Sequence, residues 1–257
     1  MKFKFIYIVF FSISSLSGFS QEAAVKKGDK KYEKYAYIDA IKTYERVAEK
    51  GYKSPEMLQK LGNSYYFNAD LANAAKWYGE LFAMTEDVDA EYFYRYSQSL
   101  KGIGEYDKAN QMLDKFNQKS GIDTRAQLYA GQKNYLEQIK KNSRRYKLEN
   151  AGINSGYSDY GSAFYGEKVV FASARDTGNF SKKKHAWTDQ YFTNMYVSDL
   201  SGDGSLSAPQ KFAKTLNTKF HESTPAFSKD GKTMYFTRNN YLDGKKGKST
   251  DKVTFLK

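Results

Sequence analysis

The chain has 257 residues, a formal net charge of +12 and no cysteine. Without cysteine it can form no disulfide, hold no metal through thiolates and carry no lipid on a cysteine, so its fold must rest on a packed core. The basic residues are spread along the sequence, which favours a solvated surface. The alternative is a surface that binds a polyanion, such as an anionic cell-wall polymer or a lipid headgroup.

Residues 1–20 have the pattern of a secretory signal peptide. A basic start, "MKFK", precedes the apolar run "FIYIVFFSISSL", and small residues follow at Gly18 and Ser20. This order is typical of a cleaved signal, and the run is shorter than the roughly 20 apolar residues that span a membrane. We therefore predict an exported protein with no transmembrane helix after cleavage; a retained anchor is the alternative.

Residues 21–142 carry an internal repeat. Gly28 and Gly62 are 34 apart in the numbering, as are the pairs Ala40/Ala74 and Tyr44/Tyr78, and a third copy is offset by one at Ser97, Ala109 and Leu113. This period is typical of the tetratricopeptide repeat (TPR), a helix–turn–helix unit in which small residues allow close helix packing. One further helix is expected over about Thr124–Asn142, closing the stack.

The first and second copies differ in ways that bear on function. Lys27 and Lys31 stand where apolar residues are usual, which is typical of a capping repeat with one polar face. Resemblance to the TPR family implies a groove for protein partners, lined by Gln59, Asn63, Tyr66, Phe67, Tyr94, Gln98 and Lys101. Exposed aromatic residues favour partner binding. The alternative is that Tyr66, Phe67 and Tyr94 pack against a neighbouring helix or the following domain.

Residues 146–257 have the composition of a sheet domain. Short runs such as "KVVFASA" and "TMYFTR" are bounded by turn residues, and "NMYVSDLSGDGSLSAPQKF" predicts a strand, a turn and a strand. Phe164 and Phe227 are 63 apart in the numbering, and Phe171 and Phe236 are 65 apart. A sheet unit that recurs after about 60 residues is typical of a propeller blade.

Two segments carry a more specific resemblance. "INSGYSDYGSAFYGEKVVFASARDTG" and "LNTKFHESTPAFSKDGKTMYFTRNNY" resemble the first two blades of a WD40-like propeller of the PD40 type. The resemblance implies an α+β multidomain chain: a TPR α-solenoid followed by one or two blades of an incomplete β-propeller. Because propellers close with about four to eight blades, we expect this sequence to be an N-terminal fragment of a longer protein.

The sequence offers few residues for chemistry. His185 and His221 lack metal-ligand spacing, and the segment Asp199–Ser207 lacks the acidic ladder of a calcium loop. No serine lies in a nucleophile elbow. We therefore predict no catalytic residue, no cofactor, no metal site and no nucleic-acid partner. Arg175 and Arg238 recur at matching places and are expected to form a salt bridge between blades or to line a propeller face.

These features together resemble envelope proteins of bacteria that use the type IX secretion system and gliding machinery. The resemblance implies a non-enzymatic scaffold in the periplasm, associated with the outer membrane, that binds secretion or gliding components. A missing C-terminal domain of the OmpA type would bind peptidoglycan. Two alternatives are an exported peptidase, gated by the propeller, whose catalytic domain is missing here, and a periplasmic TPR chaperone.

Overall fold

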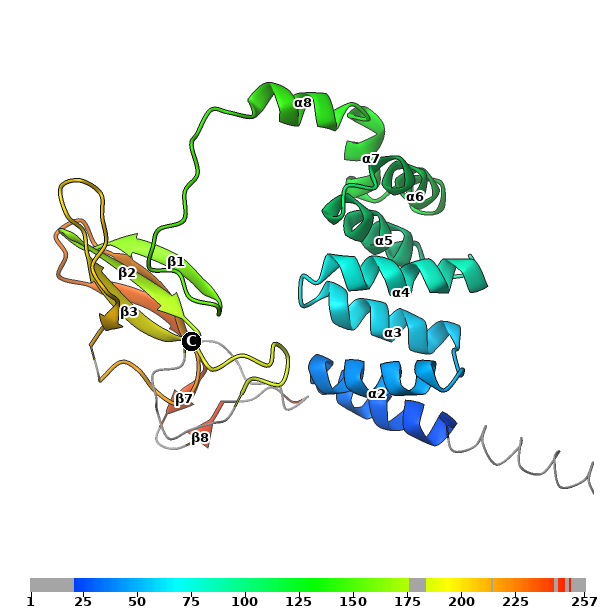
Figure 1. The fold of residues 1–257 in the computed structure, drawn as a ribbon, viewed down its shortest axis with the longest axis horizontal. Coiled ribbons are helices and arrows are strands. Elements are labelled where there is room, and N and C mark those ends of the chain that lie inside the picture. Colours follow the sequence, from blue (N-terminus) through cyan, green and yellow to red (C-terminus); the bar gives the residue numbers. More distant parts are fainter. Residues whose placement is uncertain (1–20, 176–183, 214, 243–244, 248–249, 251–257) are drawn as a thin grey trace, which may run out of the picture. The chain divides into compact units, whose positions relative to one another are not determined.

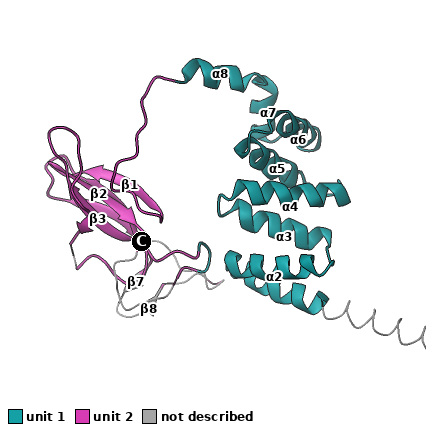
Figure 2. Ribbon diagram, in the orientation of Figure 1, with its two compact units in different colours: residues 1–143, 186–188 teal, residues 144–185, 189–257 magenta. Residues whose placement is uncertain are grey.

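The computed structural model describes residues 21–175, 184–213, 215–242, 245–247 and 250. Its contacts divide into two compact units (Figure 2): the first holds the described residues of 1–143 together with 186–188, and the second those of 144–185 and 189–257. The predicted signal peptide lies outside the described residues. No helix in the described ranges is long and apolar enough to cross a membrane.

The first unit is a stack of helix pairs (Figure 1). The described chain begins in a helix that runs to residue 32, and seven further helices follow: α2 (Tyr37–Glu49), α3 (Pro55–Tyr66), α4 (Leu71–Met84), α5 (Ala90–Gly102), α6 (Tyr106–Lys119), α7 (Thr124–Gly131) and α8 (Tyr135–Asn142). From α2 to α4 and from α3 to α5 the starts recur after 34 or 35 positions. This spacing confirms the predicted helical repeat.

Local capping explains where several of these helices begin. The Ser54 hydroxyl accepts the Met57 N–H at 3.3 Å, and Pro55 follows at the first helical position. Serine at the cap and proline after it are both favoured at a helix start. Aspartates do the same for α4, α5 and α7, at Asp70, Asp89 and Asp123.

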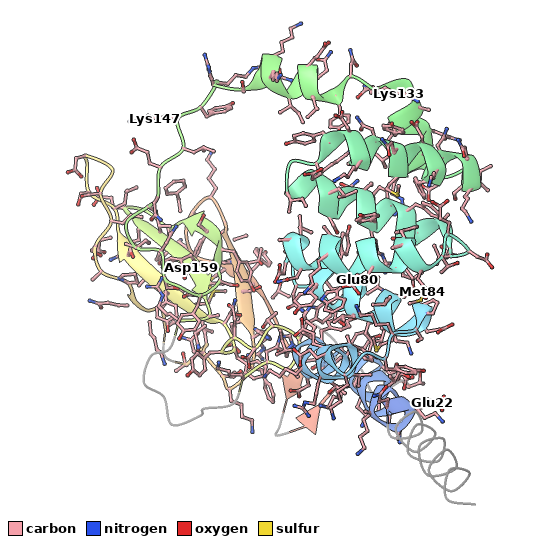
Figure 3. The ribbon with its side chains drawn as sticks, turned by 45° about the vertical axis from the view of Figure 1, so that its right-hand side comes forward. Glu22, Glu80, Met84, Lys133, Lys147 and Asp159 are labelled. Carbon is pink, nitrogen blue, oxygen red and sulfur yellow. The ribbon has the colours of Figure 1, made fainter. Side chains whose placement is uncertain are left out.

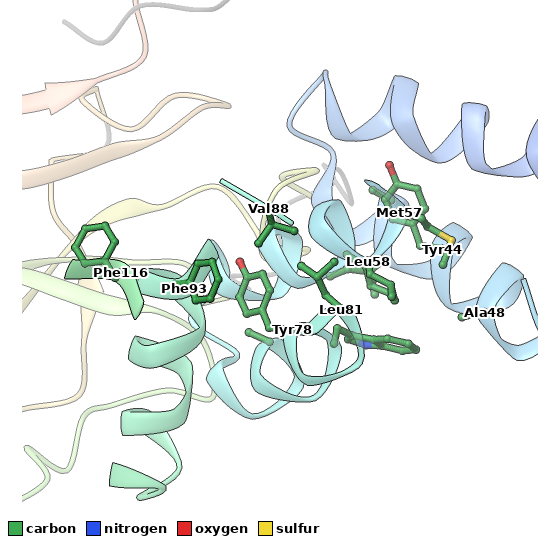
Figure 4. Packing of buried hydrophobic residues seen from close by; sticks show 14 of the residues in the cluster. Tyr44, Ala48, Met57, Leu58, Tyr78, Leu81, Val88, Phe93 and Phe116 are labelled. Atoms are coloured by element: carbon green, nitrogen blue, oxygen red, sulfur yellow. The ribbon is translucent and has the colours of Figure 1, made fainter. Parts of the chain in front are cut away.

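The repeated glycines mark the closest contact inside each pair. A Cβ atom on Gly28 would lie 2.5 Å from Cε1 of Tyr44, and one on Gly62 would lie 2.5 Å from Cε1 of Tyr78. Both tyrosines are fully buried, in a core that runs through the stack (Figure 4). In the third pair the equivalent positions are also buried and hold Ser97 and Leu113. The third pair thus has serine in place of glycine and leucine in place of the larger tyrosine, so the space that the two residues fill together is conserved between pairs.

The expected single helix over Thr124–Asn142 is wrong, because the chain breaks into α7 and α8. The hydroxyls of Tyr129 and Tyr135 both donate to Asn110 of α6, to its backbone oxygen at 3.2 Å and its side-chain oxygen at 3.2 Å. In one continuous helix two residues six positions apart would point about 120° away from each other. The break lets both tyrosines reach the same residue.

The second unit consists of antiparallel sheets (Figure 1). One sheet has the order β1-β2-β3-β4, so consecutive strands are neighbours; a hairpin β5-β6 and a short pair β7-β8 follow. The strands are β1 (Asp159–Phe164), β2 (Lys168–Ser173), β3 (Asn194–Asp199), β4 (Gln210–Lys211), β5 (Glu222–Phe227), β6 (Met234–Arg238), β7 (Tyr241–Leu242) and β8 (Lys245–Lys246). The described sheets do not close into a ring, so the propeller stays a prediction.

The hairpins β1-β2 and β5-β6 share an irregularity at the same place. The strand register shifts around Gly161 in the first hairpin and around Thr224, the equivalent position, in the second. Both residues have positive φ, 64° and 52°, and a Cβ on Gly161 would lie 3.1 Å from Cα of Thr224. A β-branched residue rarely adopts this conformation. The two bulges have the same spacing as Phe164 and Phe227, which supports the predicted sheet repeat.

Candidate interaction surface

The predicted groove residues lie on two helices. Three are in α3, Phe67 is the residue that caps the C-terminal end of α3, and the other three are in α5. Asn63 is buried, with 3% of its surface exposed, and the other six are half-buried: Gln59, Tyr66, Phe67, Tyr94, Gln98 and Lys101. The unit thus brings all seven onto neighbouring first helices of the repeat, but not as equally accessible side chains.

Asn63 connects three elements of the first unit. Its side-chain oxygen accepts the Tyr78 hydroxyl at 2.7 Å and the Arg95 Nη1 at 2.8 Å. Its amide nitrogen donates to the Tyr32 hydroxyl at 3.0 Å. Buried polar groups are stabilising when they are satisfied in this way. The Asn63 side chain therefore has a structural role: its hydrogen bonds are made to residues of the first unit and not to a partner protein.

The same arrangement stands one repeat earlier at Asp29. Its carboxylate accepts the Tyr44 hydroxyl at 2.7 Å and Nζ of Lys60, from the next repeat, at 2.7 Å. In both places one acidic or amide oxygen serves a tyrosine of its own repeat and a cation of the following one. We call each of these oxygens a shared acceptor.

Two arginines lie against the aromatic residues of the predicted groove. The Arg95 guanidinium is 5.0 Å from the Phe67 ring centre, and that of Arg125 is 4.2 Å from the Tyr94 ring centre. Glu91 joins them, since one carboxylate oxygen accepts Arg95 Nε at 3.0 Å and the other accepts Arg125 Nη2 at 2.8 Å. Stacked arginines and aromatic rings are the residue types that dominate binding energy at protein interfaces.

Residues 186–188 group with the helices of the first unit. The Trp187 ring stacks on Tyr35 at 6.0 Å between ring centres and meets the Tyr37 ring edge-on at 4.9 Å. Its indole N–H donates to the backbone oxygen of Phe67 at 3.2 Å. Phe67 therefore already has a contact within the chain, to Trp187, as expected if this residue packs internally rather than against a partner. No spacing in the sequence indicates this contact.

The remaining groove residues have fewer internal contacts. Gln98 makes a 3.4 Å contact to Ser97 Oγ, and Lys101 Nζ lies 4.1 Å from the Tyr135 ring centre. Burial lowers the pKa of Lys101 and raises that of Tyr66. A half-buried face of rings, amides and cations can hold a peptide or protein, and its use by a partner stays a prediction.

In the second unit, a carboxylate with little exposure stands at the start of each hairpin, Asp159 (labelled in Figure 3) in the first and Glu222 in the second. Asp159 accepts the Ser155 backbone N–H at 2.6 Å and pairs with Arg175 at 2.9 Å, with both side chains mostly buried. At the equivalent place in the second hairpin, Glu222 accepts the Thr218 N–H at 3.0 Å and lies opposite Arg238 in the strand pair. The ion pair that Arg175 forms lies within its own sheet rather than between blades, and the alternative that it lines a propeller face stays a prediction.

His185 and His221 are in contact, although their spacing in the sequence does not indicate it. Their ring centres are 4.8 Å apart, and the Thr193 N–H donates to Nδ1 of His221 at 3.1 Å. Burial, followed by the charge of His185, lowers the pKa of His221 to about 4, so this ring is neutral at pH 7. Within the described ranges no third histidine or carboxylate joins them as a metal site would require.

Comparisons with known proteins add little to this geometry. No protein-family model and no curated protein matches the chain. A crystal structure of the C-terminal part of a TPR repeat-containing protein from Cytophaga hutchinsonii is similar with a TM-score of 0.38 and 18% identity, over 49% of this chain and 52% of that one. The match therefore spans about half of that protein chain. Because the TM-score is low, the helical-repeat assignment rests on the helix pairs described above.

Proposed function

We propose that the chain is a non-enzymatic scaffold whose helical repeats bind a protein partner. The observation that carries the proposal is the face on α3 and α5, where Arg95 and Arg125 stack against aromatic rings. The signal-peptide pattern and the PD40 resemblance support a place in the periplasm at the outer membrane, with secretion or gliding components as partners. Peptidoglycan binding through a further OmpA-like domain rests on that resemblance alone.

Changing the partner-facing side chains is expected to release the partner without unfolding the repeats. The variant Tyr66→Ala with Gln98→Ala removes two half-buried side chains of this face, of which the Tyr66 ring also packs against the helical core. Loss of one interface hot spot of about 1.4 kcal/mol weakens binding about tenfold. Capture of envelope proteins from an extract by the immobilised full chain, quantified by mass spectrometry, measures this loss.

The matched control is Tyr106→Ala, which removes a tyrosine that is 40% exposed on α6, the second helix of its pair. It should capture the same proteins as the unchanged chain, and circular dichroism should show that all three proteins are folded at the temperature of the capture experiment. Capture that is equal for the groove variant and the control would contradict a partner site on α3 and α5.

We propose further that the second unit is part of a propeller in which another sheet covers β1. The support is a comparison of equivalent residues. The Phe227 ring stacks on Tyr165 at 4.6 Å, whereas its equivalent in the first hairpin, Phe164, is 73% exposed. Asn217 accepts the Met195 N–H at 2.8 Å, whereas its equivalent, Asn154, is exposed. The residues that contact a neighbouring sheet in the second hairpin are thus exposed at the equivalent positions of the first hairpin.

A single engineered thiol tests this covering, because the chain has no cysteine of its own. The variant Phe164→Cys should react rapidly with a maleimide in the purified chain and at least about tenfold more slowly in its native assembly in envelope preparations. Lys229→Cys, on the exposed turn between β5 and β6, should react at the same rate in both. Equal rates at position 164 would contradict a covering sheet.

A further inference from the structure

The first helix pair carries a basic groove, which we define by Lys27, Lys30, Lys31, Arg46 and Lys50. These five side chains line a cavity of about 480 Å³ between the helix of residues 21–32 and α2. Its volume is within the range of about 300–1,000 Å³ that is usual for small-molecule sites. The cavity therefore has room for a compact ligand.

The charged side chains that line this cavity are all basic. The same two helices carry acidic residues, but among the described residues no carboxylate lines the cavity. Asp29 is engaged by Tyr44 and Lys60, and Glu45 accepts the Tyr65 hydroxyl at 2.6 Å. Across the described ranges, none of the five basic groove residues forms a salt bridge. Among the described residues, no carboxylate therefore lies within ion-pair distance of the basic groove.

A polar cap does not by itself explain this arrangement. In the second repeat the position equivalent to Lys27 is Leu61, which is buried in the core. A terminal repeat needs polar residues there, but mixed charges would provide solubility equally well. The use of one sign at five positions is the feature that capping leaves unexplained.

The groove is also partly preorganised. Lys31 Nζ donates to the Thr43 hydroxyl at 3.1 Å and to the Asp39 backbone oxygen at 3.4 Å, which ties the two helices together. Ala24 and Val47 add apolar surface to the lining. Apolar surroundings strengthen the attraction between a bound anion and nearby cations.

We propose that the basic groove binds a compact anion that carries one or more phosphate groups. Arginine offers a planar fork that suits phosphate oxygens, and each lysine ammonium supplies a further charge and donors. Such a ligand has two sources, a soluble phosphorylated molecule or the headgroup of an anionic lipid, and both present the same chemistry to the groove.

The test uses the full chain and two probes. Inorganic tripolyphosphate is titrated by calorimetry, and flotation is measured with phosphatidylcholine vesicles that contain or lack phosphatidic acid. We expect saturable binding to at least one probe. The variant Lys27→Gln with Arg46→Gln and Lys50→Gln should weaken it by at least about tenfold, since it removes three of the five charges that contact the ligand.

The control removes the same charge from the same segment outside the basic groove: Lys26→Gln with Lys34→Gln and Lys42→Gln, three exposed lysines. It should change affinity by less than about threefold, which is the effect expected of general attraction alone. Saturation by tripolyphosphate identifies a soluble source, and saturation by the phosphatidic acid vesicles alone identifies a lipid source. Equal losses in the two variants, or no saturable binding to either probe, would overturn the proposal, and circular dichroism verifies that both variants fold.

Discussion

The Gly62→Ala variant is expected to lower the free energy of unfolding of the helical unit by about 2–3 kcal/mol, because adding atoms to a packed core forces it to shift. The new Cβ would lie 2.5 Å from Cε1 and 2.6 Å from Cδ1 of Tyr78, a fully buried ring. The Tyr78 hydroxyl is held by Asn63 at 2.7 Å, so the ring is not free to move aside. Chemical denaturation followed by circular dichroism measures the loss.

Two further variants separate crowding from helix propensity. Gly131→Ala, in α7, would meet no atom within 4 Å, and it should be neutral or stabilising by about 0.5–1 kcal/mol because alanine favours a helix. Adding Tyr78→Leu to Gly62→Ala imitates the serine–leucine pair of the third repeat. The double variant should lose less stability than the sum of the single changes. Additive losses would contradict the crowding argument.

The Asp159→Ala variant is expected to destabilise the sheet unit by about 3 kcal/mol, the usual effect of breaking a buried ion pair from one side. The Asp159 side chain is 11% exposed and that of its partner Arg175 is 16% exposed. The change also leaves the Ser155 N–H without its acceptor. The matched control is Asp199→Ala, whose carboxylate pairs with Lys168 in the same sheet but is 66% exposed, and which should change stability by less than about 1 kcal/mol.

The contribution of the Asp159 carboxylate to stability should also depend on pH. Burial alone would raise the pKa of Asp159, but hydrogen bonds from Ser173, Ser155 and Arg175 lower it to about 2. Because this pKa is below the value of about 3.9 in an unfolded chain, the carboxylate stabilises the fold above about pH 4. That contribution, about 2 kcal/mol, is lost as the pH falls from about 4 to 2. An unchanged acid dependence of stability in Asp159→Ala would contradict this assignment.

Features that depend on local pattern could mostly be predicted from the sequence. The recurrence of small residues and tyrosines located the helix pairs, and Pro55 marked the start of α3. The separation of Phe164 from Phe227 matches the separation of the two bulges. These features could be predicted because small residues, turn residues and aromatic residues recur at intervals set by helix and strand geometry.

Features that depend on tertiary contacts could not be read in this way. The break between α7 and α8 follows from two tyrosines that share Asn110. The contact of His185 with His221 joins residues far apart in the chain, with no spacing that would signal it. Asn63 occupies a groove position by repeat number, yet its hydrogen bonds turn it inward. In each case the partner of a side chain, rather than its position in the pattern, decides its role.

The shared acceptors also determine how the stack responds to local opening. In a linear array, stability is approximately the sum of the repeats and of the boundaries between neighbours. At Asp29 and Asn63 a boundary contains a hydrogen bond that exists only while both adjacent repeats are folded. If one repeat opens, the oxygen in its neighbour loses a donor. The opening of one repeat therefore also destabilises the neighbour that stays folded, which adds to the coupling between repeats at these two boundaries.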